Sequence, residues 1–212
     1  MTTAVMARST ATTTTAGAFV IASAAVALCR HLDPGLHEVL RTAGPLALLI
    51  GIGILVLGLH RRRGLLQHSA AAAVGLLVFA ARDLIPVVLA AMAPADVVGS
   101  GRTVSIVLLA SSLLGVIGGI VAVVIIIRRD LLGRWSAFSL LAVVAARAVF
   151  MLAGVIPFDG YQLLLIVSDA TVAVPSALLV FGGSLVLHGR SDGVRASTRR
   201  VLQAWRSSTD PT

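Results

Sequence analysis

The chain has 212 residues, of which 58% are hydrophobic and 12% charged, and its mean hydropathy is +0.99. Soluble domains carry about 25% charged residues, so this composition excludes a soluble protein and is typical of a membrane protein. The formal net charge of +8 lies mostly in short basic runs between apolar segments. In a membrane protein such runs are a topology signal, and they do not indicate nucleic-acid binding.

Residue usage sets two further limits. All 17 basic residues are arginine and the sequence contains no asparagine, which suggests a GC-rich coding genome and a bacterial source. The only cysteine in the sequence is Cys29. A single cysteine excludes an internal disulfide, a CxxC redox pair and a cysteine-based zinc site.

Residues 1–11 form a short polar segment, and the apolar run 12–29 predicts the first transmembrane helix, with a signal anchor as the alternative. A leucine directly before Cys29 is a poor match to a lipoprotein cleavage site. In the stretch that follows, Asp33 can cap a helix and Pro34 can occupy its first turn. Apolar residues at 36, 39 and 40 share one face, so we expect a short helix lying in the membrane interface.

Five more apolar runs predict five more spans, at 44–60, 69–93, 103–127, 136–156 and 161–188. The fold class is therefore an all-α, polytopic six-helix transmembrane bundle formed by residues 12–188. Small residues let transmembrane backbones approach closely. Two spans carry them at regular spacing: Gly44, Gly51 and Gly58 in the second, and Ser111, Gly115 and Gly119 in the fourth. We expect both rows to be helix-packing faces.

Arginine runs set the expected orientation. One run is Arg61, Arg62 and Arg63, the next contains Arg128 and Arg129, and the tail 189–212 carries Arg195, Arg199 and Arg200. All three must lie on one side of a six-span bundle, and the positive-inside rule makes that side cytoplasmic. Both termini are then cytoplasmic, in a bacterial plasma membrane. The tail is either a basic amphipathic helix that binds anionic lipids or a disordered charged segment.

Charged residues inside the apolar spans are the candidate functional site. A charge at the bilayer centre costs about 2.5–3.5 kcal/mol, so such residues usually face a protein interior. Counting along the helices at ~1.5 Å per residue places the charges roughly 12–18 Å below the outer end, near the midplane. The expected cluster consists of Arg82, Asp83, Ser111, Arg147 and Asp169. We expect the pairs Arg82–Asp169 and Arg147–Asp83, because neighbours i and i+1 do not face each other on a helix.

Two stretches of the chain resemble each other. RRGLLQHS followed by LLVFAARD corresponds to RRDLLGRWS followed by LAVVAARA, which matches Arg82 with Arg147. This similarity indicates a duplicated helical hairpin, and chance matching in an alanine- and leucine-rich chain is the alternative. In transporters built from repeats, binding sites lie near the midplane at the repeat interface.

Three functions are compatible with this pattern. The first is a transporter-like or channel-like bundle whose charged layer handles a polar solute or protons. The alternative is a non-transporting subunit that docks a partner or a second copy through its glycine faces, with the charges serving only to fix helix contacts. The third is an intramembrane enzyme using Asp83 or Asp169 as an acid or base. Soluble-enzyme motifs, a Walker lysine and ligand-spaced metal residues are absent from the sequence, so we expect no cofactor or metal.

Overall fold

The computed structural model describes residues 3–32, 37–58, 64–92, 101–153, 172–190 and 198. Within them every long element is helical. The helices are α1 (Thr3–Leu32), α2 (His37–Leu57), α3 (Ala70–Ala81), α4 (Ile85–Met92), α5 (Gly101–Arg128) and α6 (Arg134–Ala153). Two short 3-10 turns, η2 (Leu65–Gln67) and η3 (Arg82–Leu84), flank α3. One more helix runs from Val172 to Arg190 and is called the 172–190 helix below.

Six helical stretches of the described chain are long and apolar enough to cross a membrane. A span needs about 20 predominantly apolar residues to cross the ~30 Å hydrocarbon core. The stretches are Ala11–Cys29, Leu40–Leu57, Ala70–Met92, Val104–Arg128, Arg134–Leu152 and Val172–Arg190. The prediction of an all-α bundle with six spans is confirmed, and these spans define a multi-pass membrane protein.

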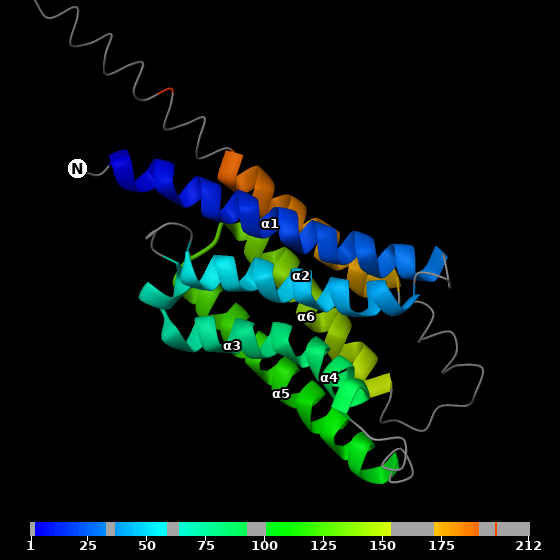
Figure 1. Cartoon of the computed structure of the whole chain (residues 1–212). Helices are drawn as coiled ribbons and strands as arrows, with labels where there is room; N and C mark the ends of the chain where they lie inside the picture. Colours follow the sequence, from blue (N-terminus) through cyan, green and yellow to red (C-terminus); the bar gives the residue numbers. More distant parts are fainter. Residues whose placement is uncertain are drawn as a thin grey trace, which may run out of the picture.

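The spans pack in a closed ring that follows the order of the chain. α1 packs along α2, α2 contacts α3, α3 packs along α5, and α5 contacts α6. The Ser139 and Ser184 hydroxyls, 3.0 Å apart, join α6 to the 172–190 helix. That helix lies against α1 and closes the ring (Figure 1). Consecutive spans are therefore spatial neighbours, and the last span meets the first.

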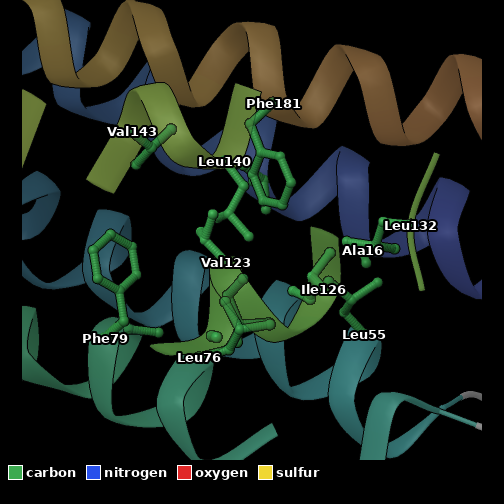
Figure 2. Close-up of a cluster of buried hydrophobic side chains, with 14 of the residues drawn as sticks. Ala16, Leu55, Leu76, Phe79, Val123, Ile126, Leu132, Leu140, Val143 and Phe181 are labelled. Atoms are coloured by element: carbon green, nitrogen blue, oxygen red, sulfur yellow. The ribbon is translucent and has the colours of Figure 1, made fainter. Parts of the chain in front are cut away.

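The interior of the ring is a continuous apolar core. Phe79 of α3 and Phe181 of the 172–190 helix are its largest fully buried side chains. Leu76, Val123 and Leu140 lie among them and bring α3, α5 and α6 into the same cluster (Figure 2). Lipid chains are as apolar as these residues, so close packing within the bundle, not transfer out of lipid, favours this arrangement.

Two pairs of glycines bring helix backbones into direct contact. A Cβ built at Gly17 of α1 would lie 2.6 Å from the carbonyl oxygen of Gly182, and one at Gly182 would lie 2.8 Å from that of Gly17. At the crossing of α3 and α5, a Cβ on Gly118 would lie 2.9 Å from the carbonyl oxygen of Gly75. Only residues without a side chain permit these approaches.

The second span begins and ends differently from the sequence-based expectation. No separate interfacial helix is present among residues 37–43, because α2 is helical from His37 and continues through Pro45. Membrane helices tolerate an internal proline when neighbouring groups satisfy the freed backbone. Gly58 follows the last residue of α2 with a φ of 81°, and its N–H donates to the Ile54 carbonyl at 2.9 Å. It is a helix terminator and not the third member of a packing strip.

The third span is interrupted at its centre by η3. Pro86 has no N–H and cannot donate to the carbonyl of Arg82, four residues earlier. The Ile85 N–H donates to that carbonyl instead, which tightens residues 82–84 into a 3-10 turn between α3 and α4. Short 3-10 stretches inside a helix often mark a functional position. Here the turn carries both charged residues of the span, Arg82 and Asp83.

Candidate functional site

An ion pair between α6 and η3 is the centre of the site. Nη1 and Nη2 of Arg147 donate to Oδ1 and Oδ2 of Asp83. The two side chains are 7% and 22% exposed. Such a two-pronged geometry fixes the mutual orientation of the groups, because the planar guanidinium matches the carboxylate. The expected Arg147–Asp83 pair is therefore present.

The neighbouring Arg82 departs from the expectation. Its Nε donates to Oδ1 of Asp83 at 3.3 Å, although adjacent helical residues were expected not to meet. The Arg82 side chain is long enough to bring its Nε beside the carboxylate of the next residue. The pairing expected for Arg82 involves Asp169, which lies outside the described residues.

Arg147 is held by a second contact besides its carboxylate. Its Cζ lies 5.0 Å from the centre of the Phe79 ring. A guanidinium over an aromatic face gains about 0.5–2 kcal/mol, with the larger value at desolvated positions. Phe79 thus anchors Arg147 on α3 one turn before Asp83, and both contacts join α6 to the third span.

Two glycines of α5 make room for this arrangement. A Cβ built at Gly115 would overlap Cδ of Arg82 and lie 3.1 Å from its Cγ. One built at Gly119 would lie 2.8 Å from the Phe79 ring and 3.0 Å from Val144. Both residues were expected to pack helix on helix. Both lie at close contacts between α5 and neighbouring elements, and their neighbours there are the side chains that form and support the charged site.

Ser111 was expected in the midplane cluster, and the structure gives it a hydrogen bond within its own helix. Its hydroxyl donates to the Leu108 carbonyl of its own helix at 2.9 Å. It does not line the cavity next to the ion pair. Ser111 therefore makes its hydrogen bond within α5 and contributes no wall to the cavity.

A cavity of about 510 Å³ adjoins the ion pair. Every span except α5 contributes to its walls, with Ser23 from α1, Arg41 from α2, Pro86 from α4, Phe150 from α6 and Leu178 from the 172–190 helix among them. Arg82, Asp83 and Arg147 form its polar wall. The cavity lies toward the end of the bundle where α1 ends and α2 begins. It has the size of a small-molecule site, for which about 300–1,000 Å³ is usual.

The glycine face of the second span is occupied within the chain. A Cβ at Gly51 would lie 3.0 Å from the Ala16 carbonyl oxygen, and one at Gly44 would lie 3.4 Å from Val26. Both neighbours belong to α1. Gly44 also lines the cavity.

The opposite end of the bundle carries basic and aromatic side chains. Arg128 and Arg129 are exposed, and Nη1 of Arg129 donates to the His68 carbonyl at 2.8 Å. Trp135 is 84% exposed at the first turn of α6. Tryptophan and arginine side by side are typical of the membrane–water interface. Six other arginines expected at a membrane surface lie outside the described residues: Arg61, Arg62, Arg63, Arg195, Arg199 and Arg200.

Within the described residues, no group of three or more His, Cys, Asp or Glu side chains is arranged to hold a metal ion. No model of a protein family, no curated protein and no solved structure matches the chain. Functional interpretation therefore depends on the geometry of the site itself.

Proposed function

We propose that the protein is a small transporter-like or channel-like bundle of the bacterial plasma membrane, whose Arg/Asp layer faces a path for a polar solute. The observation that supports this proposal is the cavity of about 510 Å³ with Arg82, Asp83 and Arg147 in its wall. A charge network that served only to fix helix contacts would be enclosed by packed side chains. Intramembrane ionisable groups beside a cavity are typical of solute and ion pathways.

The proposed orientation places the cavity nearer the outer surface. The arginine-rich end with Arg128 and Arg129 is cytoplasmic by the positive-inside rule. Both termini are then cytoplasmic, and the junction of α1 and α2 is external. Cys29 is exposed near this junction and provides a built-in reporter. A membrane-impermeant maleimide added to intact spheroplasts should label it.

The labelling experiment has a matched control. In the double variant Cys29→Ser/Arg128→Cys the only thiol lies at the other end of the bundle. This variant should label only after the membrane is permeabilised. The reverse pattern, with Arg128→Cys accessible in intact spheroplasts, would invert the proposed topology.

Solute flux is the direct test of function. Proteoliposomes containing the purified protein are subjected to osmotic shock with neutral, cationic and anionic solutes, and swelling is followed by light scattering. We expect the wild type to admit at least one charged class faster than protein-free vesicles. The variant Arg147→Gln should lose this selectivity, whereas Arg128→Gln should retain it. Swelling equal to that of empty vesicles for all three classes would contradict the proposal.

The alternative, a subunit that docks through its glycine faces, receives less support. Gly44 and Gly51 pack against α1, and Gly115 and Gly119 pack against Arg82, Phe79 and Val144. These glycines are therefore used inside the bundle and are not offered to another chain.

A further inference from the structure

The charged side chains that the structure describes around the cavity do not balance. Its walls contain three arginines, Arg41, Arg82 and Arg147, and one carboxylate, Asp83, among the described residues. In the two similar stretches of sequence, Arg82 corresponds to Arg147, whereas Asp83 corresponds to Ala148. Only one hairpin thus supplies an acid. Among the described lining residues two positive charges are thus in excess, and in a region of low polarity an opposite charge is strongly attracted.

The hydrogen-bond donors are unequally used. Asp83 accepts hydrogen bonds from both Nη atoms of Arg147, whose Nε is buried without an acceptor among the described residues. Arg82 gives this carboxylate only its Nε, at 3.3 Å, and its Nη1 is buried without an acceptor among the described residues. Leaving a buried charged donor unsatisfied is costly, and an incoming acceptor removes this cost. Among the described residues each of these two arginines thus keeps one buried donor for a ligand, and Arg82 makes the weaker contact with the carboxylate.

The remaining walls of the cavity are mostly apolar. Phe150, Val174, Pro175 and Leu178 form one side, and Val87 lies beside the charged turn. Ligand sites usually combine an apolar lining with a few polar groups that fix orientation. A fully hydrated inorganic ion has no apolar part that could pack against this lining. The lining fits an apolar body attached to a charged head.

We propose that the cavity binds an amphiphilic oxyanion, a carboxylate or phosphate ester, whose head is held by Arg82 and Arg41 and whose body packs against Phe150 and Leu178. This inference rests on the proposed function, because it names the class of solute that the cavity receives. A guanidinium recognises planar carboxylate and phosphate oxygens by paired hydrogen bonds. Such a ligand comes either from water as a small organic anion or from the bilayer as an anionic lipid headgroup.

Calorimetry on protein in phosphatidylcholine nanodiscs tests the anion class, with empty nanodiscs as the blank. Hexanoate should bind to the wild type, and hexylamine, of the same length and opposite charge, should not. Loss of a hydrogen bond to a charged group weakens binding about tenfold to a hundredfold. We expect that loss in Arg82→Gln, and unchanged affinity in Arg128→Gln. If Arg82→Gln fails to fold, Arg41→Gln serves as the second variant.

Native mass spectrometry of the protein extracted from membranes containing phosphatidylglycerol separates the two sources. If the ligand is a lipid, the wild type retains phosphatidylglycerol and Arg82→Gln releases it. If the ligand is water-soluble, lipid retention is the same in both proteins while hexanoate binding falls. Either result supports the oxyanion site.

Equal binding of hexanoate and hexylamine, or wild-type hexanoate and lipid binding in both arginine variants, would overturn the oxyanion site. The flux assay fails separately. If hexanoate binds but no solute crosses the membrane, the oxyanion site is supported and the proposed transport function is contradicted. If a charged solute crosses the membrane but hexanoate does not bind, the transport function is supported and the oxyanion site is contradicted.

Discussion

Replacing Asp83 with asparagine tests whether the ion pair holds α6 to the third span. The substitution keeps the size of the side chain and removes its charge. Arg147, whose side chain is only 7% exposed, then keeps a buried positive charge without its carboxylate. Breaking one partner of a buried pair costs about 3–5 kcal/mol. Because Asp83 is 22% exposed and asparagine still offers one oxygen, we expect the lower end, about 3 kcal/mol.

Thermal unfolding of the purified protein, followed by tryptophan fluorescence, measures this loss. For chains of 150–250 residues each kcal/mol lowers the Tm by about 2–4 °C, so Asp83→Asn should lower it by about 6–12 °C. Asp130→Asn provides the matched control, because Asp130 is exposed beyond the end of α5. A surface change of this kind stays within about 0.5 kcal/mol.

A double-mutant cycle separates the pair from its surroundings. Arg147→Gln alone should destabilise the protein to a similar extent, and the double variant should lose less than the sum of the single losses. The expected coupling is about 0.5–3 kcal/mol, as for residues in direct contact. Additive losses, or a Tm of Asp83→Asn equal to that of Asp130→Asn, would refute the view that this pair fixes the helix contact.

Three further substitutions test the helix packing and the 3-10 turn. Gly115→Leu should push the Arg82 side chain aside and lower the stability by about 1–3 kcal/mol through overpacking. Gly53→Leu is the control and should leave the Tm unchanged, because a Cβ built at Gly53 has nothing within 4 Å. Equal Tm shifts in the two variants would contradict the contact between Gly115 and Arg82. Gly182→Val should separate α1 from the 172–190 helix and lower the Tm more than Gly53→Leu does. Pro86→Ala restores an N–H for the Arg82 carbonyl, and because an internal proline costs about 3 kcal/mol, the variant should preserve or raise the Tm. Its affinity for hexanoate should fall. An unchanged affinity would show that the 3-10 turn does not shape the cavity.

Length and apolarity were enough to predict the spans from sequence. Six apolar runs of this length form helices in a bilayer, since every backbone polar group must be satisfied internally. The pairing of Asp83 with Arg147 was also predictable, because residues at equal depth on different helices are the natural partners for buried opposite charges.

The direction in which each side chain points was not predictable. Lipid-facing and core-facing surfaces of a membrane helix are both apolar, so periodicity carries little information. On α5, Ile120 is 46% exposed and Ile126 is fully buried, although the residue type is the same. For this reason the sequence did not indicate that Arg41, which follows the apolar residues at 36, 39 and 40, lines the cavity.

Glycine contacts were predicted only in part. Regular spacing drew attention to Gly44, Gly51 and Gly58, but the closest backbone crossings use Gly17 with Gly182 and Gly75 with Gly118. The available signal was a doubled glycine inside an apolar run, at 118–119 and at 182–183. Spacing along one helix cannot identify the partner, because a close crossing needs small residues on both helices at one depth.

Contact between the first span and the last has a consequence for biogenesis. As the nascent chain leaves the ribosome, the surface of α1 around Gly17 enters the membrane well before its partner at Gly182 has been translated. Until then lipid or the insertion machinery must cover that surface. Ring closure is thus the final step of assembly, and a ribosome stalled before Gly182 is translated leaves an intermediate whose α1 surface around Gly17 is still uncovered.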